Sequence, residues 1–291
     1  MIKKKIVKVG LVQSAVSTDL KSNLNKTLKM VKSAAKKGAE IICLQELYKT
    51  PYFPNKKGVK IESFLETIPG ESTEAFKVIA QKYKCSIILP IYEKAKNSKL
   101  YNTVVVLNEK GMIQHPYRKI HIPQDPSFYE KDYFEEGNNG YQLFKHKDIK
   151  YAVLICFDQW FPEAARIVKL SGAEMIFYPT AIGNVKGEKP VEGDWHDAWE
   201  TVMRGHSIAN SLPVIAVNRV GVEGNSLFWG QSFVTDAFGK ILKKATLNKD
   251  EIIVKSLNLG MNDYISDSWG FLKNRRPETY KLITKINKKN K

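Results

Sequence analysis

The sequence predicts an α/β protein built as a four-layer α-β-β-α sandwich in a single domain. Two observations support this fold class. A β-α-β pattern opens the chain and returns in its second half, and hairpins accompany it in both halves. Because β-α-β units form sheets covered by helices, two such halves give two sheets, each with helices on one face. The 291 residues, 43% of them hydrophobic, are enough to bury the core of one large domain.

The first half of the chain contains the opening β-α-β unit and a β-rich middle stretch. Leu20, Leu24, Leu28 and Val31 recur at helical spacing, and Gly38 ends this helix. Because crossovers are right-handed, the flanking strands become parallel neighbours or near neighbours. The expected elements are strands at Ile6–Gln13, Ala39–Leu44 and Cys85–Pro90, a helix capped within Ser17–Asp19 and running to about Lys37, a helix at Thr73–Lys84, and a hairpin of Tyr101–Leu107 with Gly111–Gln114.

The second half repeats this plan. Pro162 suits a first helical turn and Gly172 a helix C-cap. The expected elements are a hairpin of Tyr141–Phe144 with Lys150–Ile155, helices at Pro162–Ser171 and Trp195–Asn210, and strands at Glu174–Pro179, Val214–Asn218, Gly230–Asp236 and Glu251–Ser256. The tail from Gly260 onward is too irregular to fold alone. We therefore expect one domain over residues 1–291, in which about 261–291 form a C-terminal extension that packs on a partner subunit of a homo-oligomer, a dimer or larger.

Cys156 stands where an apolar strand turns abruptly into a helix. A thiol at such an elbow gains reactivity from helix-terminus amides and a nearby cation, because positive charge lowers its pKa from about 8.5 and the thiolate is the nucleophile. A buried structural cysteine is the alternative, since free cysteines are among the most buried residue types.

Two other strand ends carry groups that complement a thiol. Ile41–Glu46 is an apolar strand ending on a carboxylate, and Tyr117–Pro123 presents Lys119 just after a strand-like segment. Strand ends are the usual place for ligands in an open α/β sheet. Each of these segments is therefore placed to supply one group to a site shared with Cys156.

A glutamate, a lysine and a cysteine in this order resemble the nitrilase superfamily of carbon–nitrogen hydrolases. The resemblance covers nearly the whole chain and rests on Val9–Gln13, Gln45–Glu46, Tyr117–Lys119, Glu130, Cys156 and Asn218–Arg219. Cys156–Glu163 followed by Phe177–Gly183 is similar to the N-carbamoylputrescine amidohydrolase branch, which usually has Trp where this chain has Phe157. The resemblance implies the same four-layer sandwich.

Amide cleavage by a thiol needs a nucleophile, proton transfer and stabilisation of an oxyanion. We assign Cys156 as nucleophile and Glu46 as general base, which later protonates the departing ammonia and activates water. Lys119, with the backbone N–H of Phe157, would stabilise the oxyanion. The resemblance selects Glu130 as a supporting carboxylate. By spacing alone, four other acidic residues of that loop are equally available: Asp125, Asp132, Glu135 and Glu136.

The resemblance implies hydrolysis of N-carbamoylputrescine to putrescine, ammonia and carbon dioxide, a step of polyamine synthesis. Another amidase of the superfamily, acting on a carbamoyl-amino acid or an ω-amide, is the alternative. A cationic amine requires carboxylates or aromatic faces, whereas a carboxylate requires Arg or Lys. The residues expected to bind a small cationic ureido-amine substrate are Tyr52, Trp160, Glu188, Glu192, Asp194 and Trp195. The acidic loop that holds three of them could also be simply solvated.

Composition disfavours several other classes of function. The net charge of +16 would suit nucleic acid, but the lysines are spread along the chain without a stacking-aromatic or helix-turn-helix motif, so we expect no nucleic-acid partner. The five histidines show no metal-ligand spacing, and we expect neither a metal nor another cofactor. The start of the chain lacks a signal-peptide pattern, and no apolar run reaches the ~18 residues of a membrane span. We expect a cytoplasmic protein.

Overall fold

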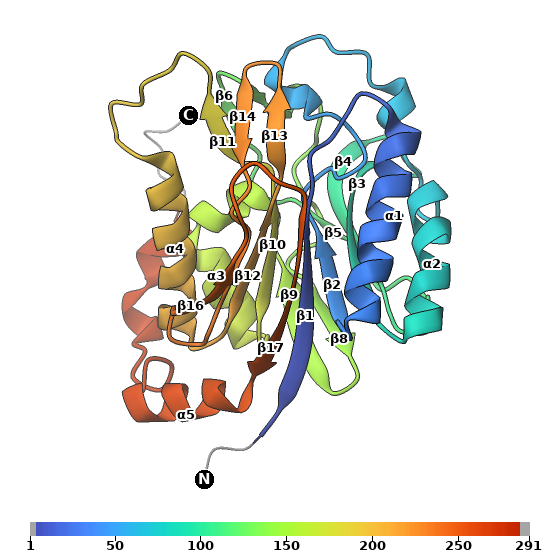
Figure 1. Ribbon diagram of the computed structural model, residues 1–291. Coiled ribbons are helices and arrows are strands. Elements are labelled where there is room, and N and C mark those ends of the chain that lie inside the picture. Colours follow the sequence, from blue (N-terminus) through green and yellow to red (C-terminus); the bar gives the residue numbers. More distant parts are fainter. Residues whose placement is uncertain (1–3, 286–291) are drawn as a thin grey trace.

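Two six-stranded sheets face each other in the centre of the molecule, and helices cover the outer face of each (Figure 1). The computed structural model describes residues 4–285. This arrangement is the expected α-β-β-α sandwich. The first sheet has the order β17 (Glu251–Asn258), β1 (Ile6–Gln13), β2 (Ile41–Leu44), β3 (Ser86–Lys94), β4 (Leu100–Leu107) and β5 (Tyr117–Arg118). The second has the order β16 (Ile241–Lys244), β15 (Phe233–Thr235), β12 (Val214–Asn218), β10 (Ile176–Thr180), β9 (Ile149–Val153) and β8 (Leu143–His146).

The central strands β2, β3 and β4 of the first sheet are buried on both faces, because the second sheet covers one face and α1 (Leu20–Lys36) and α2 (Glu71–Tyr83) cover the other. Consecutive side chains of a strand point to opposite faces. Along β2, Cys43 accordingly belongs to the core between the sheets, whereas Ile42 and Leu44 pack with the helices. A strand buried on both faces reads as a continuous apolar run, as the sequence of β2 does.

The second sheet is covered on its outer face by α3 (Pro162–Leu170) and α4 (Trp195–Asn210). Trp199 and Met203 of α4 are fully buried in the same core cluster as the strands of this sheet. Asp194 caps α4, since its carboxylate accepts hydrogen bonds from the first-turn N–H groups of His196 and Asp197. The expected bounds of α4, β1 and β12 are confirmed.

Small elements form a rim at the carboxyl ends of the parallel strands, at the top of the molecule in Figure 1. They are a three-stranded sheet of β11 (Gly183–Val185), β14 (Ser226–Trp229) and β13 (Val220–Glu223), and a hairpin of β6 (Gln124–Asp125) and β7 (Phe128–Tyr129). Short 3₁₀ helices join them at Phe53–Asn55, Glu62–Phe64, Glu130–Asp132 and Cys156–Trp160. The three-stranded sheet was not predicted from sequence, because its strands are short and partly exposed.

One expected strand is absent, and one strand of the second half pairs with the first half. Gly111–Gln114 is not a strand: the hairpin partner of β4 is β3, which continues past Pro90 and pairs with β4 along its length. β17 comes from the second half of the chain but lies in the first sheet, where it runs antiparallel to β1, from Gln13 opposite Glu251 to Ile6 opposite Asn258. Its partner could not be read locally, because strand pairing depends on how the two halves pack.

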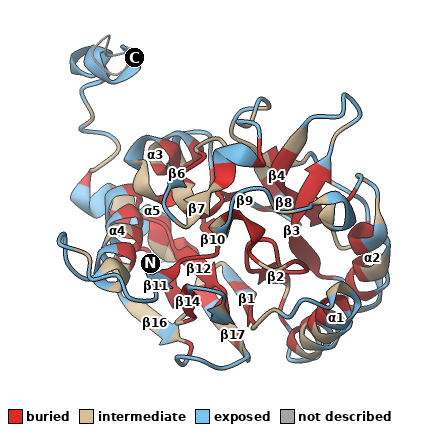
Figure 2. Cartoon of the chain, turned by 90° about the horizontal axis from the view of Figure 1, so that it is seen from above, coloured by how far each residue is buried: buried red, intermediate tan, exposed pale blue. Residues whose placement is uncertain are grey.

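The tail from Gly260 is not irregular throughout. It begins with the helix α5 (Gly260–Trp269), followed by 3₁₀ turns at Pro277–Thr279 and Lys281–Thr284, and the side chain of Asn262 anchors α5 by donating to the carbonyl of Glu174 at 2.7 Å. Beyond α5 the chain leaves the body of the molecule and is largely exposed (Figure 2). Residues 286–291 of the expected extension lie outside the described residues, and its packing on a partner stays a prediction. None of the helices within residues 4–285 is long and apolar enough to cross a membrane.

Candidate active site

Glu46 lies just beyond the carboxyl end of β2 and is completely buried. One carboxylate oxygen, Oε1, accepts hydrogen bonds from the side-chain amide of Asn102 at 2.7 Å and from the ammonium of Lys119 at 2.9 Å. The other oxygen, Oε2, has no hydrogen-bond partner among the described residues. A buried polar atom without a partner is costly, unless a ligand or a proton satisfies it. Oε2 is therefore the atom of Glu46 that is free to exchange a proton.

Lys119 follows β5 directly and is buried between two carboxylates. Its Nζ lies 2.9 Å from Oε1 of Glu46 and 2.6 Å from Oε2 of Glu130. Burial by itself lowers the pKa of Lys119, but the charges of Glu130 and Glu46 outweigh it and raise the pKa above its ordinary value. The side chain is thus a permanent cation. An ammonium has three donors, so the two carboxylate contacts leave one N–H group of Lys119 without a carboxylate partner.

Glu130 starts the 3₁₀ helix Glu130–Asp132 and has less freedom than Glu46. Its Oε2 accepts from Lys119, and its Oε1 accepts from the hydroxyl of Tyr52 at 2.8 Å. Burial raises the pKa of Glu130 to about 7, with Lys119 lowering it and Glu46 raising it. Burial is also the main cause of the raised pKa of Tyr52, which keeps this hydroxyl a donor.

Cys156 opens the 3₁₀ helix Cys156–Trp160 with a φ of +40°, in the left-handed region that a side chain rarely adopts. Such strain persists only where the surroundings enforce it, and it is concentrated at functional sites. The thiol is unpaired and lines a cavity. The helix also begins with free amides, since the first N–H groups of a helix have no acceptor within it, and Phe157 supplies one of them.

The thiol of Cys156 is not activated in the way expected from sequence. Burial and the charge of Glu46 raise its pKa well above the ordinary value, although Lys119 and the backbone amide of Ala181 both lower it. Lys119 is the expected nearby cation, but burial and the charge of Glu46 raise the pKa of Cys156 by more than Lys119 lowers it. Cys156 therefore rests as a neutral thiol and requires a base to take its proton as it reacts.

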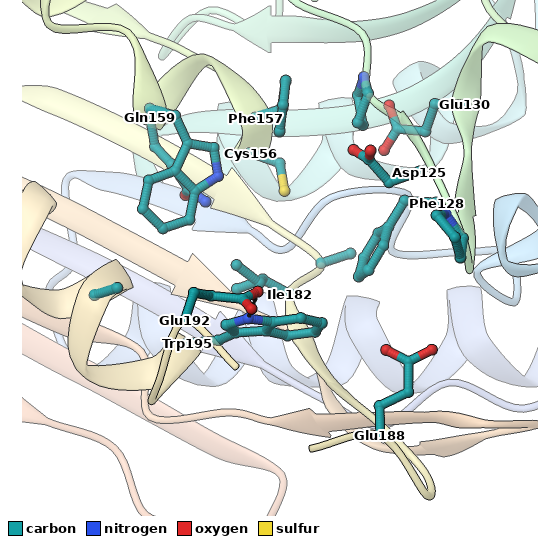
Figure 3. Close-up of a pocket in the computed structure, with 15 residues that line it drawn as sticks. Asp125, Phe128, Glu130, Cys156, Phe157, Gln159, Ile182, Glu188, Glu192 and Trp195 are labelled. Carbon is teal, nitrogen blue, oxygen red and sulfur yellow. Dashed lines mark hydrogen bonds between the residues drawn. The ribbon is translucent and has the colours of Figure 1, made fainter. Parts of the chain in front are cut away.

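The cavity in front of Cys156 has a volume of about 460 Å³ (Figure 3). Its walls are aromatic, and carboxylates stand around its outer part. The aromatic and acidic residues of the lining include Phe128, Trp160, Trp195, Asp125, Glu188 and Glu192. Glu192 and Trp195 lie across the cavity from the sulfur of Cys156, and the indole N–H of Trp195 donates to Glu192 at 2.6 Å. No lysine, arginine or histidine of residues 4–285 lines the cavity.

The structure brings most of the expected site residues together. Trp160, Glu188, Glu192 and Trp195 line the cavity beside Cys156, Phe157 and Glu130. Tyr52, Glu46 and Lys119 do not line it. Tyr52 supports Glu130 through its hydroxyl, and Lys119, which is completely buried, joins Glu46 to Glu130. Asp194 is not among the residues that line the cavity. Its carboxylate is used to cap α4, because the first helical turn needs acceptors for its free N–H groups.

Asn102 and Gln159 were not predicted from sequence, and Asp125 was named only as an alternative to Glu130. Asn102 of β4 orients Glu46, Asp125 adds a carboxylate to the cavity, and Gln159 adds a buried amide. Asn102 left a signal, since a polar residue within the strand Leu100–Leu107 needs a partner once buried. Within the described part of the chain, no group of three His, Cys, Asp or Glu side chains could hold a metal ion.

Comparison with known proteins shows similarity along nearly the whole chain. The sequence profile of the carbon-nitrogen hydrolases matches residues 8–263. The chain is 35% identical to an N-carbamoylputrescine amidase of Solanum lycopersicum, over 99% of this chain and 98% of that protein. It is 36% identical to a citrullinase of Francisella tularensis, over 96% and 98% of the two chains. A solved carbon-nitrogen hydrolase from Helicobacter pylori G27 is 37% identical, with a TM-score of 0.91 over 97% of this chain and 99% of the other.

Proposed function

Because the chain belongs to the carbon–nitrogen hydrolase family and is an amidase that hydrolyses amide C–N bonds, we propose that its substrate is N-carbamoylputrescine. The products would be putrescine, ammonia and carbon dioxide, which makes the reaction a step of polyamine synthesis. Relatives named N-carbamoylputrescine amidase at 35–36% identity support the substrate class, and the shape and charge of the cavity support the choice within it.

The first half of the proposed reaction forms a thioester. Oε2 of Glu46 takes the proton of the Cys156 thiol while the sulfur attacks the ureido carbonyl carbon. The remaining donor of Lys119 and the N–H of Phe157 stabilise the oxyanion. As the C–N bond to the terminal nitrogen breaks, Glu46 returns the proton to it and ammonia leaves. The raised pKa of Cys156 supports this order, since the thiol keeps its proton until a base removes it.

The second half hydrolyses the thioester. Glu46, again ionised, takes a proton from water, and the hydroxide attacks the same carbonyl carbon in the same oxyanion site. The sulfur leaves and recovers its proton from Glu46. The product is a carbamic acid, which loses carbon dioxide to give the free amine. Glu130 and Asn102 keep Lys119 and Glu46 in place through both halves.

The observation that carries the substrate assignment is the charge of the outer cavity. Asp125, Glu188 and Glu192 line it, and no basic side chain of the described residues does. A primary ammonium several methylenes from the ureido group would meet carboxylates and the face of Trp195, both of which favour a cation. A carboxylate in the same place would meet only like charge.

Citrulline is the instructive competitor, because a relative of similar identity is named citrullinase. Citrulline presents both an ammonium and a carboxylate at its far end, and N-carbamoyl-β-alanine presents only a carboxylate. The acidic cavity therefore favours the order N-carbamoylputrescine, citrulline, N-carbamoyl-β-alanine. The long-range attraction of a +16 protein for anions opposes this order, but it is screened beyond ~8–10 Å in physiological salt.

The test is ammonia release by the purified protein from these three compounds. We expect kcat/KM for N-carbamoylputrescine to exceed that for citrulline by at least ~10-fold, which corresponds to ~1.4 kcal/mol of differential binding in the transition state. Equal or faster cleavage of N-carbamoyl-β-alanine would overturn the substrate, while the amidase chemistry would stand.

The cellular setting is proposed with the substrate. Cys43, Cys85 and Cys156 are all unpaired, which suits a reducing compartment such as the cytoplasm. Exposed apolar side chains on α5 and the following tail, such as Trp269 and Leu282, support a homo-oligomer in which this segment meets a partner subunit. Sedimentation of the full chain and of a chain ending after Gly270 tests this arrangement.

A further inference from the structure

Asp158 is a completely buried carboxylate that does not line the cavity, yet it lies two residues beyond Cys156. It accepts four hydrogen bonds, two on each oxygen. The hydroxyl of Tyr117 and the backbone N–H of Ile155 donate to Oδ2 at 2.7 and 2.9 Å. The backbone N–H and the ring Nδ1 of His121 lie 3.0 and 2.7 Å from Oδ1. Four donors satisfy the acceptor capacity of a buried carboxylate.

Asp158 holds the segment that carries Lys119. Tyr117 and His121 stand two residues before and two residues after Lys119, so Asp158 holds the lysine segment on both sides. Burial and then the charge of Asp158 raise the pKa of Tyr117, which keeps its hydroxyl a donor. The ring of His121 stacks on Phe161 with centroids 3.6 Å apart, which fixes its plane.

The same carboxylate also holds the nucleophile segment. Ile155 donates its N–H to Oδ2 of Asp158, and the N–H of Asp158 donates back to the carbonyl of Ile155 at 3.0 Å. This reciprocal pair closes the turn on both sides of Cys156, the residue with the strained φ of +40°. Because a strained backbone relaxes unless its surroundings enforce it, the turn depends on these bonds.

We propose that Asp158 is a positioning residue that sets the separation of Lys119 from Cys156, by tying the lysine segment and the nucleophile turn to one buried carboxylate. Lys119 is 37 residues from Cys156 along the chain, and each segment is otherwise attached to a different sheet. An error of about 1 Å between two reacting groups costs on the order of 10²-fold in rate. Because both segments bind the same carboxylate, the separation of Lys119 from Cys156 is fixed.

The test uses Asp158→Asn in the full-length protein. An amide carries one acceptor and one NH₂ group, so whichever way it turns, the NH₂ faces a pair of donors. Each pair includes a backbone N–H, either of Ile155 or of His121, which cannot become an acceptor. Asp158→Asn must therefore lose either the hydrogen bond from the backbone N–H of Ile155 or the one from the backbone N–H of His121. Tyr117→Phe is the milder variant, since it deletes one hydroxyl and leaves both backbone ties in place.

Two readouts separate positioning from a merely structural role. The first is kcat and KM for N-carbamoylputrescine, normalised to folded protein. The second is the rate at which iodoacetamide alkylates Cys156 as a function of pH, followed by mass spectrometry. Lys119 lowers the thiol pKa, so its displacement should raise that pKa and move the alkylation profile to higher pH.

We expect Asp158→Asn to lower kcat ~10²-fold with KM within ~3-fold, and Tyr117→Phe to lower kcat ~10-fold. Glu66→Gln is the matched control, because Glu66 is also a buried carboxylate that accepts a backbone N–H and a hydroxyl, both from Ser72 at 2.8 Å. It should lower the melting temperature and leave kcat and the alkylation profile unchanged.

Wild-type kcat and alkylation profiles in both variants would overturn the proposal. If Asp158→Asn does not fold, Tyr117→Phe decides alone, and an unchanged kcat in that variant overturns the proposal. The alkylation assay uses no natural substrate. A wild-type protein that does not cleave N-carbamoylputrescine would thus refute the proposed substrate, while the alkylation profiles would still decide the role of Asp158.

Discussion

The guanidinium of Arg219 donates a hydrogen bond to the backbone carbonyl of Glu46 at 3.0 Å, across 173 positions of the sequence. The same nitrogen lies within hydrogen-bonding distance of the carbonyls of Leu47 and Thr50, at 2.6 and 3.1 Å. Leu47 has a φ of +49°, so the turn after Glu46 is strained. The arginine therefore holds the turn that carries the proposed general base, from the end of a strand in the other sheet.

Arg219→Lys should destabilise the protein and slow the reaction. The planar guanidinium pairs with Glu223 at 2.8 Å while it binds the three carbonyls, and a single ammonium cannot do both. Removing one partner from a buried ion pair costs about 3–5 kcal/mol, and Arg219→Lys should cost less because lysine keeps the charge. Urea unfolding should show a loss below this range, and kcat should fall. Unchanged unfolding would mean that the carbonyls find other donors.

Cys156→Ser should abolish turnover without affecting the fold, because a hydroxyl is far less acidic than a thiol and Glu46 cannot deprotonate it as readily. Circular dichroism and ammonia release measure the two properties. Cys43→Ser and Cys85→Ser serve as controls and should retain activity, since both side chains lie in apolar core clusters away from the cavity. Retained activity in Cys156→Ser would refute the thioester mechanism.

Glu46→Gln should lower kcat by at least ~10²-fold, which is the range of general acid–base catalysis. The amide keeps the size of the side chain and can still accept from Lys119, so KM should change little. Steady-state ammonia release measures both constants. A rise in KM with an unchanged kcat would indicate that Glu46 binds the substrate rather than transferring protons.

Tyr52→Phe should shift the acid limb of the kcat profile to higher pH. Burial raises the pKa of Glu130 to about 7, and the Tyr52 hydroxyl opposes this by stabilising the ionised carboxylate. As pH falls through 7, Glu130 takes up a proton and loses its charge contact with Lys119. Without the hydroxyl, that protonation occurs at a higher pH. Profiles of kcat between pH 5 and 9 for both proteins decide the matter, and a shift to lower pH would contradict the assignment.

Asp125→Asn, Glu188→Gln and Glu192→Gln should raise KM for N-carbamoylputrescine, with little effect on kcat. They remove negative charge from the outer cavity, which the ammonium meets before the ureido group reaches Cys156. Asp194→Ala is the matched control on the same loop. It should cost ~1 kcal/mol of stability through loss of the helix cap and leave KM unchanged. A KM effect in Asp194→Ala alone would restore the role that the sequence suggested for it.

The sequence alone determined the fold class and the three groups at the centre of the site. The strand Val214–Asn218 and the helix Trp195–Asn210 were predicted to the residue, because apolar periodicity and caps are local properties of the chain. Glu46, Lys119 and Cys156 could be found because each follows an apolar strand, and strand ends gather at one edge of a sheet.

Only the tertiary structure decided which other residues act with them. Asn102 and Glu46 are 56 positions apart, and Lys119 and Glu46 are 73 apart. Their contacts exist because β2, β4 and β5 belong to one sheet and bring these residues to the same edge of it, which depends on strand pairing across the chain. By spacing, Glu130 was indistinguishable from the other acidic residues of its loop until Tyr52 and Lys119 were placed against it. The places of two aspartates were also decided there: the free N-terminus of α4 bound the carboxylate of Asp194, and the β6–β7 hairpin placed Asp125 at the cavity.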